Sequence, residues 1–254
     1  MILAIDVGNT NIVLGGIEEG KQVFSARLAS DRNKTEDQYA LDIQGILTMH
    51  RVDIAAIEGG ILSSVVPYLQ TVIPKAVKLL TGVDLMVVGP GIKTGLSIRM
   101  DNPASVGSDL IVAAVAARAK YKAPIAIVDM GTATTLSVVA KNGNYIGGMI
   151  IPGLWTSMNA LSAHAAQLPY IDLNGSAKLL GTNTVDCMRS GAVFGTAAMI
   201  DGLIDRMEEE LGMKCTVVAT GGLASSIVSC CRHEIVCDDD LLLKGMWYLY
   251  EKNK

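Results

Sequence analysis

Apolar and polar positions divide the chain into short buried strands and longer amphipathic helices. Two strand-like runs, at residues 2–5 and 11–17, open the chain and enclose a polar turn. The same arrangement returns at residues 125–128 and 135–140, again around a polar turn. The pattern predicts that an antiparallel strand pair opens each of two similar halves.

The spacing of the two polar turns supports this division. Asp6 of the first turn aligns with Asp129 of the second, an offset of 129 − 6 = 123 residues in a chain of 254. The offset is close to half the chain, so we expect two domains, at residues 1–122 and 123–254. The boundary falls near Lys122, after an apolar helical run.

Helical spacing of apolar residues follows each strand pair. Thr35 and Gln38 form the pattern of a capping box, which predicts a helix over residues 34–51. Asn142-Gly143 predicts a tight hairpin turn. Further helices are predicted at residues 67–80, 107–122, 154–168, 184–212 and 241–252, and short strands within residues 55–66, 84–89 and 215–224. Together these elements predict an α/β fold.

Composition narrows the range of partners. The formal net charge is −4, which argues against a nucleic-acid surface, and the apolar runs are shorter than the roughly 20 residues that span a bilayer. We therefore expect a cytoplasmic protein that acts on a small molecule, with no nucleic-acid or membrane partner. The five cysteines and three histidines lack metal-ligand spacing, so we interpret the cysteines as reduced core residues.

The two polar turns carry the residue types of a phosphate site. A glycine and a threonine after a strand present backbone N–H groups and a hydroxyl to an anion. An acid at the same place, Asp6 or Asp129, would repel phosphate unless a cation bridged the two groups. These features predict a magnesium nucleotide. A single copy would equally suit an ordinary hairpin, but the second copy favours the phosphate site.

Two further segments carry candidate chemistry. Asp109 follows Gly107 at the start of an apolar helix, where an acid serves either as a complement to the helix dipole or as a base that accepts a proton from a substrate hydroxyl. The residues themselves leave both roles open. Gly221 and Gly222 follow a strand, and such a glycine turn can pack against a base or ribose.

Taken together, these motifs resemble the type III pantothenate kinases, within the superfamily of actin-like ATPases, sugar kinases and Hsp70. The resemblance runs nearly end to end, through "DVGNTN", "DNPASVGSD", "DMGTATT", "GGMIIPGLWTSMNAL", "GTNTVDCMRSGAVFG" and "ATGGLA". It implies two ribonuclease-H-like halves, each a mixed sheet flanked by helices, with ATP in a central cleft and a homodimer joined through the second half. The implied activity is ATP-dependent phosphorylation of pantothenate, the first step of coenzyme A biosynthesis.

The resemblance also implies roles for individual residues. Asp109 becomes the catalytic proton acceptor, Asp129 holds a monovalent cation, K⁺ or NH₄⁺, and Asp6 binds Mg²⁺ directly or through water. The implied ATP site comprises Asp6, Val7, Gly8, Asn9, Thr10, Asn11, Ile12, Val13, Thr132, Gly221 and Gly222. The implied pantothenate site comprises Met100, Gly107, Ser108, Asp109, Leu110 and Thr184.

Two positions depart from the family pattern. Leu110 stands where the family has an arginine that meets the pantothenate carboxylate, and Met100 stands where it has a tyrosine. Losing a guanidinium at an anion site removes about 1.5 to 3 kcal/mol of binding. Two alternatives therefore stay open: a kinase of the same architecture with another small alcohol as acceptor, and a nucleotide-binding paralogue without kinase activity. The joint presence of Asp6, Asp109 and Asp129 argues against the second.

Overall fold

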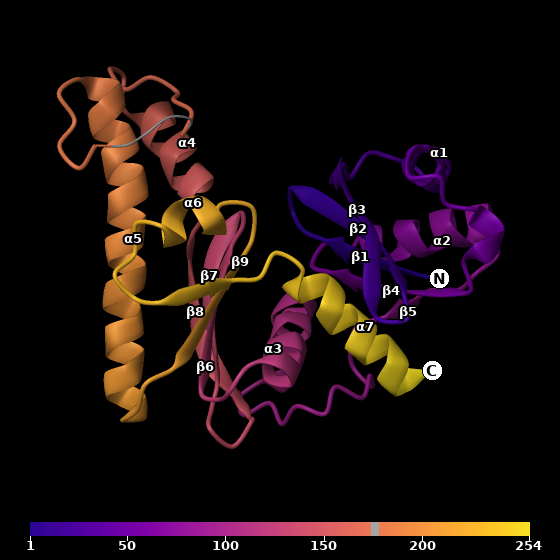
Figure 1. Ribbon diagram of the computed structural model, residues 1–254. Helices are drawn as coiled ribbons and strands as arrows, with labels where there is room; N and C mark the ends of the chain where they lie inside the picture. Colours follow the sequence, from indigo (N-terminus) through magenta and orange to yellow (C-terminus); the bar gives the residue numbers. More distant parts are fainter. Residues whose placement is uncertain (174–177) are drawn as a thin grey trace. The chain divides into compact units, whose positions relative to one another are not determined.

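The computed structural model describes residues 1–173 and 178–254, which form two compact units (Figure 1). Unit 1 comprises Met1–Leu96, Asp101–Ala119 and Asp240–Lys254, and unit 2 comprises Ser97–Met100 and Lys120–Asp239. The chain therefore passes between the units more than once, and its last helix belongs to the first unit.

Unit 1 is built on a mixed five-stranded sheet of order β3-β2-β1-β4-β5. The strands are β1 (Ile2–Val7), β2 (Asn11–Glu18), β3 (Lys21–Ala29), β4 (Gly59–Ser64) and β5 (Met86–Val87). The first three strands form an antiparallel meander, whereas β4 runs parallel to β1 and β5 runs parallel to β4. The central strand β1 therefore ends beside the end of β4.

Helices cover both faces of this sheet. They are α1 (Glu36–Met49), α2 (Leu69–Thr81), α3 (Ser108–Lys120) and α7 (Leu241–Asn253), with short 3-10 turns at Ile54–Ala56 and Pro103–Ser105. Alternate residues of β1 serve opposite faces: Leu3 belongs to the core under α1 and α2, and Ala4 to the core with Val112 of α3 and Leu243 of α7. Burial on both faces explains why β1 is continuously apolar from Ile2 to Ile5 and does not alternate.

Unit 2 repeats this topology. Its sheet has the order β10-β9-β6-β7-β8, with the same parallel and antiparallel neighbours. The strands are β6 (Ile125–Met130), β7 (Ala133–Val139), β8 (Tyr145–Pro152), β9 (Thr216–Thr220) and β10 (Ile235–Cys237), and the helices are α4 (Leu154–His164), α5 (Thr184–Leu211) and α6 (Ala224–Val228). Ala126 and Val128 of β6 pack in one core with Met158 of α4 and Ile200 of α5.

Most of the predicted elements are confirmed. The capping box of Thr35 and Gln38 starts α1, and Asn142-Gly143 turns the hairpin between β7 and β8. The sequence pattern missed β3, because its polar residues and Gly20 turn conceal a strand that pairs along nearly all of β2. It also placed the last helix with the second half, whereas α7 packs on β1 and β4 in unit 1. None of the described helices is long and apolar enough to cross a membrane.

Candidate active site

The first polar turn joins β1 to β2 and closes tightly. The last ladder pair is Val7 with Ile12, and the Gly8 N–H donates to the Asn11 carbonyl at 2.9 Å. Asp6 pairs with Val13 one step before the turn and is almost fully buried, with 9% of its surface exposed. A buried acid at the end of a strand, next to a turn with a glycine, matches the predicted arrangement for a phosphate turn.

Ser30, the residue after β3, holds this turn from outside. Its Oγ donates to the Gly8 carbonyl at 2.6 Å, and its backbone N–H donates to the Thr10 carbonyl at 2.9 Å. Both contacts bind carbonyl oxygens of the turn, whose negative dipoles are unfavourable to an anion. Ser30 therefore fixes the turn in one conformation and occupies these two carbonyl oxygens.

The end of β4 links the first turn to Asp109. Ser63 of β4 pairs in parallel register with Asp6 and lies on the same face of the sheet. The Ser63 and Ser108 hydroxyls are 3.1 Å apart, and the Ser108 hydroxyl donates to the Ser64 carbonyl at 3.2 Å. Ser108 and Asp109 begin α3. Unit 1 therefore brings the predicted catalytic acid to the end of the sheet where β1 carries Asp6.

The environment of Asp109 favours a proton acceptor. One of its carboxylate oxygens accepts the N–H of Leu110 at 2.8 Å, and among the described residues no cation pairs with it. Burial raises the pKa of Asp109 above its ordinary value near 3.8. A Cβ on Gly107 would collide with the same carboxylate, so the glycine permits this position of the acid.

The second polar turn, between β6 and β7, resembles the first. Met130 pairs with Thr134 in the last step of the ladder, and the Gly131 N–H donates to the Ala133 carbonyl at 3.0 Å. The Thr132 carbonyl accepts the Gly153 N–H at 3.1 Å and the Thr156 hydroxyl at 2.7 Å. The start of α4 therefore holds this turn, in the role that Ser30 has in unit 1.

Gly221 lies directly beside the second turn. Asp129 pairs with Thr220 at the end of β9, so the following Gly221 lies next to it. Gly221 has φ +96°, and a Cβ there would lie 2.7 Å from the Asp129 carboxylate and equally close to the Met130 backbone. Only glycine suits both the conformation and the space. Unit 2 thus brings together the predicted Asp129, Thr132 and Gly221.

The predicted acceptor residues are divided between the units. Gly107, Ser108, Asp109 and Leu110 form the start of α3 in unit 1, whereas Met100 and Thr184 belong to unit 2. Met100 is 37% exposed, and its sulfur lies 3.5 Å from the place where a Cβ of Gly147 would be. Thr184 is the first residue of α5, whose cap is Asn183.

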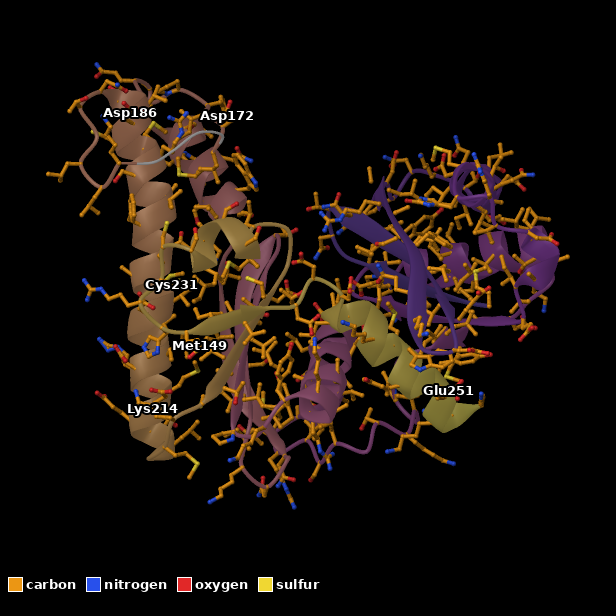
Figure 2. The ribbon with its side chains drawn as sticks, viewed as in Figure 1. Met149, Asp172, Asp186, Lys214, Cys231 and Glu251 are labelled. Carbon is orange, nitrogen blue, oxygen red and sulfur yellow. The ribbon has the colours of Figure 1, made fainter. Side chains whose placement is uncertain are left out.

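A charged cluster lies next to Thr184. Arg189 of α5 approaches Asp186 at 3.3 Å and Asp172 at 3.7 Å. Figure 2 shows both acids at this end of α5, with Lys214 at the other. The two acids therefore neutralise the charge of Arg189.

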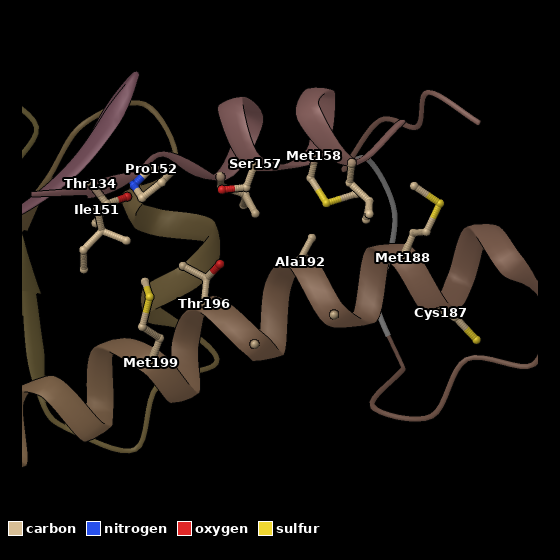
Figure 3. Close-up of a pocket in the computed structure, with 14 residues that line it drawn as sticks. Thr134, Ile151, Pro152, Ser157, Met158, Cys187, Met188, Ala192, Thr196 and Met199 are labelled. Atoms are coloured by element: carbon tan, nitrogen blue, oxygen red, sulfur yellow. The ribbon is translucent and has the colours of Figure 1, made fainter. Parts of the chain in front are cut away.

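A pocket of about 510 Å³ lies in unit 2 between α4, α5 and the end of β8. Figure 3 shows Met158 of α4 and Met188 of α5 pointing into the space between the two helices. Its wall is mainly apolar, and none of the predicted ATP or pantothenate residues is among the described residues that line it. The pocket therefore suits an apolar group and not a phosphate.

Asp205, Glu208 and His233 form the described cluster of potential metal ligands, with their ligating atoms within 4.8 Å of one another. His233 Nε2 lies 2.9 Å from Asp205 Oδ1. Both Glu208 oxygens already accept hydrogen bonds, from Lys214 Nζ at 2.6 Å and from the Cys215 N–H at 2.9 Å. These contacts explain the cluster as an ion-pair network at the end of α5.

Sequence reasoning missed Ser30, Ser63 and Ser64. Ser63 and Ser64 end an otherwise apolar strand in "GGILSS", and polar residues at the end of a buried strand are a usable signal. Ser30 carried no such signal, because its role depends on β3, which the pattern did not predict. Its position became apparent only from the ladder of β3 with β2.

Comparisons with solved structures identify the fold. Component A of (R)-2-hydroxyglutaryl-CoA dehydratase from Acidaminococcus fermentans has a TM-score of 0.61 at 16% identity, covering 98% of this chain and 96% of that one. A ROK hexokinase from Thermus thermophilus has a TM-score of 0.51 at 14% identity, covering 100% and 99%. The chain therefore has the fold of the actin-like ATPases and sugar kinases, as predicted.

Sequence comparisons identify the family within this class. The family model described as type III pantothenate kinase matches residues 2–206. Proteins named type III pantothenate kinase from Moorella thermoacetica and Bacillus cytotoxicus are each 43% identical to this chain, over all of it and over 100% and 97% of their own lengths. The chain belongs to the type III pantothenate kinase family.

Proposed function

We propose that this chain transfers the γ-phosphoryl group of ATP to the hydroxyl of pantothenate, the first step of coenzyme A biosynthesis. One observation carries the proposal beyond family membership. Asp109, a half-buried acid without a cationic partner among the described residues, lies at the same end of the sheet as Asp6 and its glycine turn. A phosphate turn and a base in one unit are the parts that phosphoryl transfer to an alcohol requires.

The nucleotide is held by the residues of the two turns. In unit 1, Asp6 and the backbone of residues 8–11 would hold the phosphates together with Mg²⁺, which neutralises phosphate charge. Oxygen donors suit this ion, and the Asp6 carboxylate and the Thr10 hydroxyl supply them. In unit 2, Thr132 would contact ATP, Gly221 and Gly222 would contact its adenosine, and Asp129 would hold the monovalent cation, K⁺ or NH₄⁺.

Asp109 accepts the proton during transfer. As the hydroxyl oxygen of the acceptor forms its bond to the γ-phosphorus, the bond from that phosphorus to the β-phosphate oxygen breaks and ADP leaves. The hydroxyl proton passes to the Asp109 carboxylate. A raised pKa suits this task, because it brings the base closer to the pH at which the enzyme works. Ser108 holds the start of α3 on β4, which keeps the carboxylate in place.

Leu110 favours a second candidate acceptor. A carboxylate would gain little from a leucine in place of the family's arginine, whereas a neutral alcohol could pack an apolar part on it. We therefore keep a kinase of another small alcohol as the alternative. Asp109 and the phosphate turns serve both reactions equally.

We also propose a homodimer joined through unit 2. Large apolar side chains are exposed on this unit, among them Ile150 on edge strand β8 with 76% of its surface exposed and Trp155 on α4 with 39%. Side chains of this kind are often covered by a partner. Light scattering of wild type and Ile150→Glu would test this, with a shift to monomer expected in the variant.

One assay tests the proposed activity. ADP release would be measured with pantothenate and with a panel of neutral alcohols of similar size, with and without Mg²⁺ and K⁺. We expect turnover with pantothenate that requires Mg²⁺ and rises with K⁺. Turnover with a neutral alcohol alone would establish the alternative, and nucleotide binding without turnover on any acceptor would indicate a paralogue without kinase activity.

A further inference from the structure

We infer that Arg32 is an additional phosphate-binding residue for ATP. The hydrogen-bonded segment of residues 30–33, which follows β3, holds Arg32 at the first turn. The inference rests on the proposed function only in taking ATP as the ligand. An Arg32 Nη atom donates to the Asn9 side-chain oxygen at 3.2 Å. Asn9 is exposed at the tip of the first turn, so the guanidinium reaches the turn from outside.

The segment before Arg32 is fixed by several hydrogen bonds. Ser30 binds two carbonyls of the turn, as described above. The hydroxyl of Tyr39, whose side chain is fully buried under the sheet, accepts the Asp31 N–H and donates to the Asp31 carbonyl, both at 2.9 Å. The Asp31 carboxylate also accepts the Asn33 N–H at 2.9 Å. Arg32 therefore projects from a backbone that is anchored on both sides.

The charges around Arg32 leave it available to an anion. The nearby Lys34 is paired with Asp42 at 2.7 Å, whereas no carboxylate lies within ion-pair distance of Arg32 among the described residues. A guanidinium offers planar, paired N–H donors that match phosphate oxygens. Next to a turn predicted to bind phosphate, a cation without an acidic partner suits the negative charge of a nucleotide. Ser30 acts as a positioning residue, because it orients the turn that Arg32 reaches.

Isothermal calorimetry with MgATP, without any acceptor, tests Arg32 directly. The variants are Arg32→Gln and Arg32→Lys, with Arg51→Gln as control, since Arg51 is an exposed arginine in the loop after α1 of the same unit. Loss of a charge-assisted hydrogen bond at an exposed site should weaken MgATP binding about tenfold in Arg32→Gln. Arg32→Lys should recover part of this loss, and the control should stay within about twofold of wild type.

Salt dependence and turnover separate binding from a merely structural role. Tetramethylammonium chloride, added at constant K⁺, should weaken MgATP binding less steeply in Arg32→Gln than in wild type, because one screened attraction is gone. With pantothenate, KM for ATP should rise while kcat stays unchanged. Ser30→Ala should raise the same KM, Ser30→Thr should restore it, and Ser25→Ala on β3 should leave it unchanged.

Each outcome decides one claim. Wild-type affinity for MgATP in Arg32→Gln would overturn the inference, as would equal salt dependence in the two proteins. If that variant does not fold, wild-type affinity for MgATP and wild-type salt dependence in Arg32→Met, which also lacks the charge, would overturn it as well. Binding that depends on Arg32 in a chain without turnover on pantothenate would support the inference and defeat the proposed function.

Discussion

The turn after β1 and the turn after β6 occupy equivalent places in two sheets of the same topology, yet different parts of the chain hold them. Residues 8–11 lie between the pair Val7–Ile12, and residues 131–133 lie between Met130–Thr134, so the second turn is one residue shorter. Ser30 holds the first turn and the start of α4 holds the second. The two turns thus share a strand topology, but different residues hold each of them by hydrogen bonds.

The neighbouring parallel strand makes the larger difference. Beside Asp6, strand β4 carries Ser63. The Ser63 hydroxyl contacts the hydroxyl of Ser108, and Asp109 is the next residue in the chain. Beside Asp129, strand β9 ends in Thr220 and continues into Gly221, which has no side chain. The repeated sheet therefore supplies two turns that are predicted to bind anions, but among the described residues only the first has a candidate base beside it. The following predictions test this asymmetry.

Asp109→Asn should have the largest effect. The asparagine retains an oxygen for the Leu110 N–H but cannot accept the substrate proton, so turnover should fall about a hundredfold or more while ATP affinity stays unchanged. Steady-state kinetics and calorimetry would measure the two quantities. Glu36→Gln, which removes a first-turn acid from α1, serves as control. Equal turnover in wild type and Asp109→Asn would return Asp109 to a helix-dipole role.

The same variant should be more stable than wild type at neutral pH. Because burial raises the pKa of Asp109, the folded state binds its proton more tightly than the unfolded state, and stability falls as pH rises through the folded pKa. The neutral asparagine avoids this loss. Thermal melts should show the gain at pH 7 and its disappearance below about pH 3.8. A gain that persists in acid would have another origin.

Asp6→Asn and Asp129→Asn should separate the two cations. If Asp6 serves Mg²⁺, Asp6→Asn should weaken MgATP binding about ten- to a hundredfold, the range for a charge-assisted contact. Asp129→Asn should remove the activation by K⁺ and leave the dependence on Mg²⁺ intact. Titration of each ion against ADP release would measure both effects. If ADP release depended on Mg²⁺ and K⁺ in the same way in both variants, the proposal that each turn serves a different cation would be wrong.

Local sequence signals were sufficient to predict the strand pairs and turns that the two units share. The aligned Asp6 and Asp129 turns, the capping box at Thr35 and the Asn142-Gly143 hairpin all depend on residues close in sequence, and the structure confirms these elements. The strand ladders then place Gly221 beside Asp129. Neighbours of this kind follow once the parallel register of β9 and β6 is known.

The parts that the sequence did not predict depend on distant contacts. The contact of Ser63 with Ser108 joins residues 45 positions apart, and no local pattern marks such a pair. The strand β3 has only Phe24 fully buried, so its hydrophobic pattern is weak and its pairing with β2 decides its structure. Helix α7 is amphipathic, but its spacing does not say which sheet it covers.

Leu110→Arg sharpens the question of the acceptor. If pantothenate is the substrate, the new guanidinium should meet its carboxylate and lower KM for pantothenate about tenfold, with KM for ATP unchanged. If the acceptor is a neutral alcohol, the arginine would be partly buried without a partner and activity on that alcohol should fall. KM values for both substrates would decide between the two. Leu110→Met, similar in volume, controls for packing.

Glycine-to-alanine substitutions at the turns should give a graded series that compares the two turns directly. Gly221→Ala should be the most damaging, because the added Cβ would lie 2.7 Å from the Asp129 carboxylate at a φ of +96°, and such strain costs about 1 to 3 kcal/mol. Gly8→Ala should cost less, since its Cβ would lie 3.2 Å from the Asn11 carbonyl oxygen, which can shift slightly.

Gly131→Ala should be the mildest of the three. Its Cβ would lie 3.6 Å from the Ala133 carbonyl oxygen, an ordinary van der Waals contact, so we expect a change in the free energy of unfolding below about 0.5 kcal/mol. Denaturant unfolding of the three variants would measure the order. If Gly131→Ala nevertheless weakens MgATP binding while Gly8→Ala does not, the phosphates approach the second turn more closely than the first, and the assignment of the main phosphate turn to unit 1 would be reversed.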